Sequence, residues 1–340
     1  MRSDIRIVAR LVAGGLVMLF AFTALYLAAF HAPRAKGFEV GVVGGPAQAA
    51  RLQSALDGAS RGAFDVRRYD TEPQARAALL DTTVHGVLVP GPTGDRILVA
   101  QALGVPPTEA VTGALRGVAG RAPTVVQDLR PLPAGDRRGL SSLFIVIGTL
   151  LPSVVFGVLL SVFGRQRSAR VRWGAVLAYA TFAGLVAAFN ANVLTGALTH
   201  DFVGTAVVCG LLALAASAAA HGLGHLAGEP GIVAAILTLT LVGLSSSGGA
   251  VGYQFEPGFY GAVSQLLPPG AAVTAVRNVQ YFDWAGTLAP LAVLGAWAIG
   301  GLAFGLLGER YGPHVRAAAR PPDRRGRRRE RRQAAQGSLP

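Results

Sequence analysis

The residues of this chain that could bind a metal gather at one place. His221, His225 and Glu229 recur every four residues, so a continuous helix would place them on one face. Two imidazoles and a carboxylate can bind zinc. However, glycines interrupt this stretch and weaken the required helix, and the order of the residues differs from the HExxH pattern of zinc enzymes. The spacing alone therefore predicts no metal centre.

Sequence patterns for nucleotide or nucleophile chemistry are also missing. A phosphate-binding P-loop needs GxxxxGK followed by Ser or Thr, and the only lysine, Lys36, lies outside any such pattern. Gly44 and Gly45 follow a predicted strand but lack the GxGxxG spacing of a dinucleotide site. There is no GxSxG nucleophile elbow. We therefore expect no catalytic residue and no cofactor in this chain.

Arginine supplies nearly all of the positive charge, and its distribution predicts an orientation. The formal net charge is +13, and ten arginines lie between Arg310 and Arg332. This tail is expected to contact anionic lipids; it lacks interleaved aromatic residues, so nucleic-acid binding is not expected. Further arginines beside apolar segments are candidates for docking a cytoplasmic partner, or they set orientation alone. They are Arg6, Arg10, Arg165, Arg167, Arg170 and Arg172.

Arg277 is the only arginine or lysine between Arg172 and Arg310. A lone charge near hydrocarbon needs a partner or water, and Glu256 and Asp283 are the acids available nearby. We predict that Arg277 pairs with an acid and fixes a broken helix at the external mouth of a membrane domain. The residues expected at this mouth are Pro268, Pro269, Arg277, Tyr281 and Phe282.

Other polar residues lie within long apolar segments. Serine and asparagine in such segments commonly form hydrogen bonds between helices, which is the favoured interpretation here; lining a transport path is the alternative. Gly301 and Gly305 form a GxxxG pair suited to close helix contact, and a dimer interface is one use of such a pair. The candidates for path lining are Asn190, Asn192, Ser245, Ser246 and Ser247.

These residues are positioned by six long apolar segments. The chain is 51% hydrophobic and 14% charged, whereas a soluble domain carries about 25% charged residues. Each segment approaches the roughly 20 residues that a helix needs to cross a bilayer, and each is apolar all round. We therefore predict an α-helical integral membrane protein with six transmembrane helices. The segments are Leu11–Phe30, Leu140–Phe163, Trp173–Ala197, Val203–Leu226, Ile232–Val251 and Leu288–Leu307.

The polar region 31–139 is predicted to be an inserted small α/β domain, because strand and helix patterns alternate along it. Predicted strands are Glu39–Val43, Phe64–Tyr69, Gly86–Val89 and Arg96–Gln101, with Val126–Gly139 as a connector. Helices are predicted from Pro46 to Asp57, from Thr71 to Thr82 and from Thr108 to Ala119.

The positive-inside rule places both ends of the chain in the cytoplasm and residues 31–139 outside. Residues 1–30 then form a cytoplasmic start and an uncleaved anchor, because the apolar run is longer than that of a signal peptide. Residues 140–307 form a five-helix membrane domain with a re-entrant region at 256–283. Residues 308–340 form a disordered, cytoplasmic basic tail.

Two passages are similar to a known family. The helix Gln74–Leu80 leads into VHGVLVP at Val84–Pro90, and QLLPPGAAVTAVRNVQYF at Gln265–Phe282 precedes the last apolar segment. With the overall layout, these passages resemble ABC transporter type-2 membrane proteins, in particular the bacterial group that includes the phage infection protein.

The resemblance implies the permease subunit of an ABC-type exporter in the bacterial plasma membrane, driven by a separate ATPase and acting as a homodimer or with a similar partner. The alternative is a non-transporting scaffold for envelope assembly or secretion, or a phage receptor, that binds partners through its external domain. The sequence leaves the substrate open.

Overall fold

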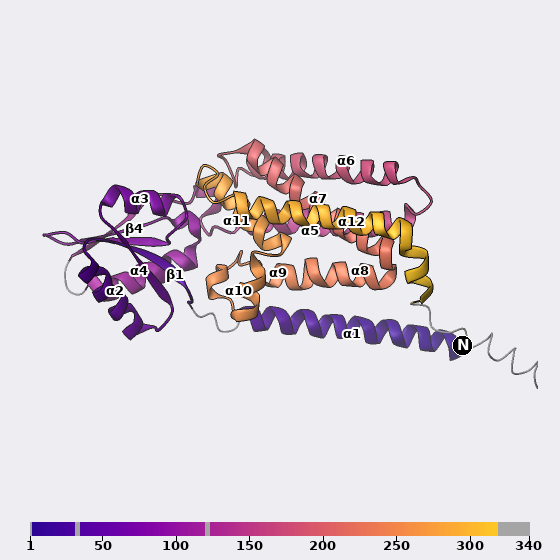
Figure 1. Ribbon diagram of the computed structural model, residues 1–340, viewed down its shortest axis with the longest axis horizontal. Coiled ribbons are helices and arrows are strands. Elements are labelled where there is room, and N and C mark those ends of the chain that lie inside the picture. The colour runs from indigo at the N-terminus through magenta and orange to yellow at the C-terminus, as the bar shows by residue number, and fades with distance from the viewer. Residues whose placement is uncertain (1, 31–34, 120–122, 319–340) are drawn as a thin grey trace, which may run out of the picture.

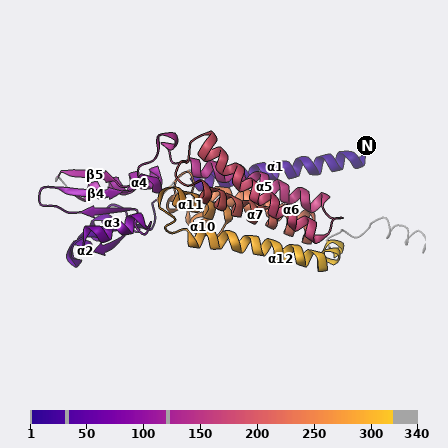
Figure 2. The same cartoon turned by 90° about the horizontal axis from the view of Figure 1, so that it is seen from above.

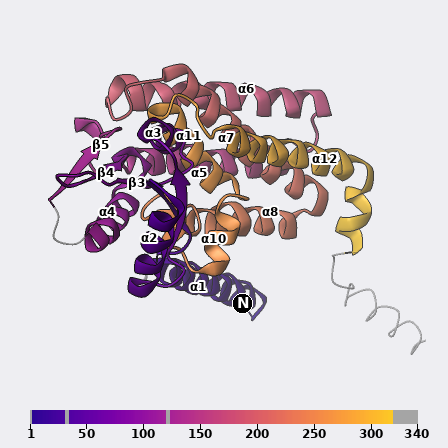
Figure 3. The same ribbon diagram turned by 60° about the vertical axis from the view of Figure 1, so that its left-hand side comes forward.

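The structure is a computed structural model that describes residues 2–30, 35–119 and 123–318. Figure 1 shows a small sheet at one end of a bundle of long helices, and Figure 3 brings the sheet to the front. The chain is therefore largely helical with one small α/β region, as predicted. The tail from residue 319 and the side chains of Arg6 and Arg10 lie outside the described part of the chain.

The sheet domain, residues 35–119 and 123–139, alternates strands and helices. Its strand order is β2-β1-β3-β4-β5, in which β3 and β4 pair antiparallel and the other neighbours pair parallel. The predicted strand Phe64–Tyr69 is found with its predicted bounds. The elements are β1 (Phe38–Val43), α2 (Pro46–Ala59), β2 (Phe64–Tyr69), α3 (Glu72–Leu80), β3 (Gly86–Val89), β4 (Asp95–Val99), η1 (Gln101–Leu103), α4 (Val105–Ala119), β5 (Thr124–Asp128) and η2 (Ala134–Asp136).

Two hydrophobic clusters cover the two faces of this sheet. On one face Leu52 and Leu56 of α2 and Leu115 of α4 pack against strand residues such as Val40. On the other face Leu79 of α3 joins a cluster that continues into the helical bundle. This second cluster therefore runs from the sheet into the bundle, and fully burying each such side chain contributes about 1.5–3 kcal/mol.

Within the described part of the chain, the bundle contains five helices that are long and apolar enough to cross a membrane. The predicted segment Ile232–Val251 forms a shorter apolar helix, Glu229–Ser245, so the sixth span is not established. The helix ends at Ser245 because the next residues, Ser246 to Gly249, form a turn. The bundle elements are α1 (Arg2–Phe30), α5 (Ser141–Phe163), α6 (Ala169–Ala188), η3 (Phe189–Leu194), α7 (Phe202–Ala227), α8 (Glu229–Ile236), η4 (Leu237–Val242), α9 (Gly243–Ser245), η5 (Tyr253–Phe255), α10 (Gly258–Ser264), α11 (Pro268–Tyr281) and α12 (Leu288–Ala318).

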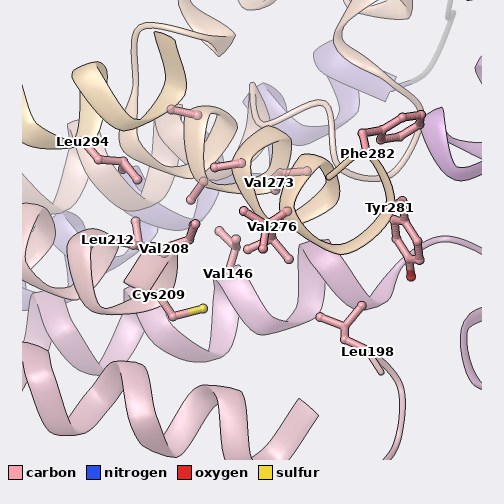
Figure 4. Packing of buried hydrophobic residues seen from close by; sticks show 14 of the residues in the cluster. Val146, Leu198, Val208, Cys209, Leu212, Val273, Val276, Tyr281, Phe282 and Leu294 are labelled. Carbon is pink, nitrogen blue, oxygen red and sulfur yellow. The ribbon is translucent and has the colours of Figure 1, made fainter. Parts of the chain in front are cut away.

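The short helix α11 lies at the centre of the core. Figure 4 shows its Val273 and Val276 among Val146 of α5, Val208 of α7 and Leu294 of α12. All five side chains are at most 2% exposed. The helix nearest the sheet domain is therefore held from several sides by long helices.

Small residues allow α7 and α12 to approach each other closely. A Cβ atom added at Gly301 would lie 2.4 Å from the backbone of Ala218 and Ala219. One added at Gly305 would lie 2.3 Å from the Trp173 ring. The predicted GxxxG contact is thus made within the chain, so this face is not free for a dimer partner.

Helix α1 is packed much less tightly than the others. Figures 1 and 2 place it along the outside of the bundle, and only 6% of its apolar stretch Val12–Ala29 is buried. The Tyr260 hydroxyl of α10 donates a hydrogen bond to the Leu25 carbonyl at 3.0 Å. Most of its apolar surface is therefore open to lipid or to another protein.

The two ends of the bundle differ in character. The sheet domain occupies one end, while the start of α1, the loop between α5 and α6 and the far end of α12 lie at the other (Figure 1). Arg165, Arg167 and Arg170 lie in or beside this loop and are exposed. The arginine clusters and the sheet domain therefore lie at opposite ends.

Replacing Gly301 with Ala should destabilise the fold, because the added methyl group meets backbone atoms of α7 that cannot move independently. The expected loss is about 1–3 kcal/mol in SDS-induced unfolding of the detergent-solubilised protein. Gly300→Ala is the matched control, since a Cβ there meets nothing within 4 Å. Equal stability of the two variants would contradict the tight α7–α12 contact.

Candidate functional site

The predicted broken helix forms the floor of the junction between the bundle and the sheet domain. Chain direction breaks between α10 and α11, and α11 begins at Pro268 with proline in its first turn. Pro268 and Pro269 are buried, and Tyr281 and Phe282 are buried where α11 ends. Residues expected at one external mouth are thus grouped on one helix and the turn after it.

Arg277 of α11 bonds to the sheet domain and not to an acid. Its Nη1 donates to the carbonyl of Leu103 at 3.1 Å. The prediction of a pair with Glu256 or Asp283 is wrong, because both acids have other partners: Glu256 accepts from the Gly248 amide at 2.9 Å and Asp283 pairs with Arg130 at 2.7 Å.

The environment of Arg277 is unusual for a cation. Burial lowers the pKa of its guanidinium, and the nearby Tyr281 and Asp136 act in the opposite direction. Asp136 is itself engaged, because its Oδ1 accepts from the amides of Leu140 and Ser141 at the start of α5. Among the described residues Arg277 therefore forms no direct ion pair, and the carboxylate of Asp136 acts on its charge from a longer distance.

The turn after α11 is held by bonds to several elements. Asp283 and Trp284 both have positive φ, 48° and 69°, a conformation that is costly for non-glycine residues. The Trp284 indole donates to Asp201 at 2.9 Å, and the Gln280 amide donates to Thr205 at 2.6 Å. Side-chain bonds to the start of α7 and to Arg130 thus fix a strained turn at the junction.

A cavity of about 270 Å³ lies at this junction. Its walls come from the sheet domain, α11, the start of α12 and the segment after α9. The wall combines polar and apolar side chains, and Arg277 is the only arginine or lysine among the described residues that form it. Its polar side chains are Thr82, His85, Ser247, Tyr253, Gln254, Gln265, Thr274, Arg277 and Asn278.

His85 and Gln254 join the two parts of the protein across the cavity wall. The His85 Nε2 and the Gln254 Nε2 are 2.6 Å apart, so the amide donates to an imidazole that is neutral. Burial lowers the pKa of His85 to about 4. Neither residue is among the predicted site residues, because the one signal in the sequence is a histidine directly before an apolar strand.

Glu256 is the second buried titratable group near the junction. Its side chain is 4% exposed, and its Oε2 has no hydrogen-bond partner among the described residues. Burial raises its pKa to about 7, and the bond from the Gly248 amide opposes that shift. At neutral pH the carboxyl group is therefore close to its midpoint of titration.

The polar residues considered for path lining do not form one path. Ser245, Ser246 and Ser247 are buried and donate to carbonyls of their own helix. Asn190 instead lines a separate apolar groove of about 690 Å³ between α5 and α6, whereas the Asn192 amide is buried without a described partner. Only Ser247 reaches the junction cavity.

The opposite end of the bundle carries the expected arginines, with one difference. Arg172 is 4% exposed and forms an ion pair with Glu309 of α12. It therefore connects α6 to α12 and presents no free charge to a partner. Among the described side chains, the docking candidates left at this end are Arg165, Arg167 and Arg170.

The three residues considered for a metal site, His221, His225 and Glu229, do not lie on one continuous helix. His221 and His225 stack at 5.7 Å within α7, but Gly228, with φ 72°, ends that helix. Glu229 begins α8 and is exposed. His221 packs instead against Trp173 with a ring distance of 5.3 Å. Glu229 therefore does not share a helical face with the two imidazoles.

The titrations of Glu256 and His85 should oppose each other. The pKa of Glu256 is about 7 in the folded protein, against 4.5 for the free side chain. Its contribution to the free energy of unfolding therefore falls as pH rises from 4.5 to about 7. The pKa of His85 is about 4 in the folded protein, against 6.5 for the free side chain. Its contribution to the free energy of unfolding therefore rises with pH between these two values. Each amounts to about 3 kcal/mol.

Unfolding free energies of wild type, Glu256→Gln and His85→Gln, measured from pH 4.5 to 6.5, test this balance. Relative to wild type, Glu256→Gln should gain stability as pH rises, because only the histidine contribution remains. His85→Gln should lose stability as pH rises. Parallel pH profiles for all three proteins would show that these groups are not buried as described.

Comparison with known proteins gives no further guide to this junction. Searches against protein-family models, curated proteins and solved structures find no match to this chain. Function must therefore be argued from the geometry of the two ends of the bundle.

Proposed function

We propose that this chain is the membrane-spanning permease subunit of an ABC-type exporter, driven by a separate ATPase. One observation carries the proposal: α12 joins the two ends of the bundle. Its first turns, at Ala289, Pro290 and Val293, line the junction cavity. Its far part, at Glu309, pairs with the buried Arg172 beside the arginine loop.

This connection supports a transfer of motion. A partner that binds Arg165, Arg167 and Arg170 would move the start of α6, which Arg172 ties to Glu309. A helix moves as a rigid rod over short distances, so a shift at Glu309 would also shift the turns of α12 that line the cavity. ATP-driven motion at one end would thereby change the shape of the cavity at the other.

The remaining parts of the proposal concern placement. The chain would lie in the bacterial plasma membrane with both termini in the cytoplasm and residues 31–139 outside. It would act as a homodimer or with a similar membrane partner. The exposed apolar surface of α1 supports such a partner, because only 6% of its apolar stretch is buried within the chain.

A second candidate function is a non-transporting scaffold or phage receptor. The edge strand β5 favours it, because among the described strands β5 pairs only with β4, and its Val125 is 61% exposed. An open edge can accept a strand from another protein. The scaffold function gives no role to the link that α12 makes between the two ends of the bundle, whereas the exporter function does. We therefore prefer the exporter.

Changing Arg165, Arg167 and Arg170 together to Gln should abolish co-purification with an ATPase. Loss of three exposed cations from one docking surface should weaken binding by roughly tenfold or more. The measurement is recovery of the ATPase with the tagged permease at low ionic strength, quantified by mass spectrometry.

The matched control changes three exposed arginines of the sheet domain, Arg51, Arg61 and Arg116, to Gln. These lie at the other end of the molecule, so ATPase recovery should stay at the wild-type level. If wild type recovers envelope proteins and no ATPase, the scaffold replaces the exporter as the better explanation.

Membrane orientation can be tested by cysteine labelling, after changing the buried Cys209 to Ser. Ser60 of the sheet domain and Gln166 of the α5–α6 loop are both exposed. In intact cells a membrane-impermeant maleimide should label Ser60→Cys and leave Gln166→Cys unlabelled until lysis. The reverse pattern would overturn the proposed export direction.

A further inference from the structure

The junction cavity has an unbalanced charge. Arg277 lines it, while no aspartate or glutamate is found among the described residues of its wall. The nearest acids are engaged elsewhere: Asp283 with Arg130, Glu256 with the Gly248 amide, and Asp136 with the start of α5. A cation inside a partly enclosed space therefore lacks an anion at contact distance.

The donors of Arg277 are also largely unused. A guanidinium carries five N–H donors in a rigid fork. Within the described chain, the bond from Nη1 to the Leu103 carbonyl is the one hydrogen bond that Arg277 makes. Arg277 is half-buried and lines the cavity, so its remaining N–H donors can bind a ligand or water there.

The surrounding wall suits an oxyanion. Asn278 follows Arg277 on α11, and Thr82 comes from the sheet domain. Hydroxyl and amide groups can donate to oxygen atoms that the guanidinium fork binds in pairs. Val273, Ala289 and Val293 add an apolar side to the same cavity.

We propose that the junction cavity is a binding site for the anionic group of a small molecule or lipid, a phosphate or carboxylate, held by Arg277. The volume of about 270 Å³ admits such a group with a short apolar extension. The ligand would contact the sheet domain, α11 and α12 together, so binding would stabilise the junction. This proposal does not depend on transport and holds equally for a scaffold.

The test uses the full-length protein purified in a neutral detergent. Calorimetric titration with inorganic phosphate and with dihexanoyl phosphatidic acid should give saturable binding, and Tm should rise with the logarithm of the ligand concentration above Kd. Binding of phosphate alone would identify a soluble anion as sufficient, whereas binding of the lipid alone would identify a headgroup with its chain. No binding of either anion would overturn the proposal.

Two variants locate the site. Arg277→Gln should weaken binding by roughly tenfold or more, because the charged donors are lost. Gln265→Glu keeps the size of the side chain and places a carboxylate in the cavity wall, and it should weaken binding similarly. The second variant keeps the proposal testable if the first does not fold.

The matched control is Arg130→Gln. Arg130 lies at the same junction and pairs with Asp283, but it does not line the cavity. Its anion affinity should equal that of wild type. If Arg130→Gln loses binding while Arg277→Gln and Gln265→Glu keep it, the anion binds to the surface and the proposed cavity site is wrong.

Discussion

A half-buried cation between two packed parts of a protein needs hydrogen-bond acceptors, and Arg277 places this constraint on the junction. Its guanidinium bonds to the Leu103 carbonyl, so the sheet domain must lie against α11 at that point. The continuous core strengthens the same arrangement, because Leu79 and Leu98 of the sheet domain belong to one hydrophobic cluster with Val276 of α11. The sheet domain and the bundle therefore behave as one packed unit at the junction.

The bundle meets a different constraint, since apolar helices gain little from burying surface that lipid would cover equally well. Close approach of the helices at small residues stabilises the bundle through van der Waals contacts instead. Gly301 lies against the backbone of α7, and Gly157 of α5 lies against Ser217 of the same helix. Helix α7 is consequently the central helix, and the share of its apolar stretch that is buried, 61%, is the highest among the five long helices.

Sequence patterns predicted the parts whose signal is local. Thr71 caps α3 as expected, because its hydroxyl accepts from the Gln74 amide. Strand β5 was missed, since Thr124–Asp128 is a short exposed edge strand whose sequence lacks clear alternation. The partner of Arg277 was predicted wrongly for another reason. The partner is a backbone carbonyl, which every residue has, so no residue type in the sequence indicates it. For the same reason the cavity, which combines four separate segments, could not be read from the chain.

These constraints also indicate where the molecule can move. A hinge between sheet domain and bundle would have to break the shared core, the Arg130–Asp283 pair and the His85–Gln254 bond together. Displacing α1 breaks less packing, because only 6% of its apolar stretch is buried within the chain. Local opening follows the least packed element. Conformational change should therefore separate α1 from the bundle beside α9 and α10 while the sheet domain stays in place.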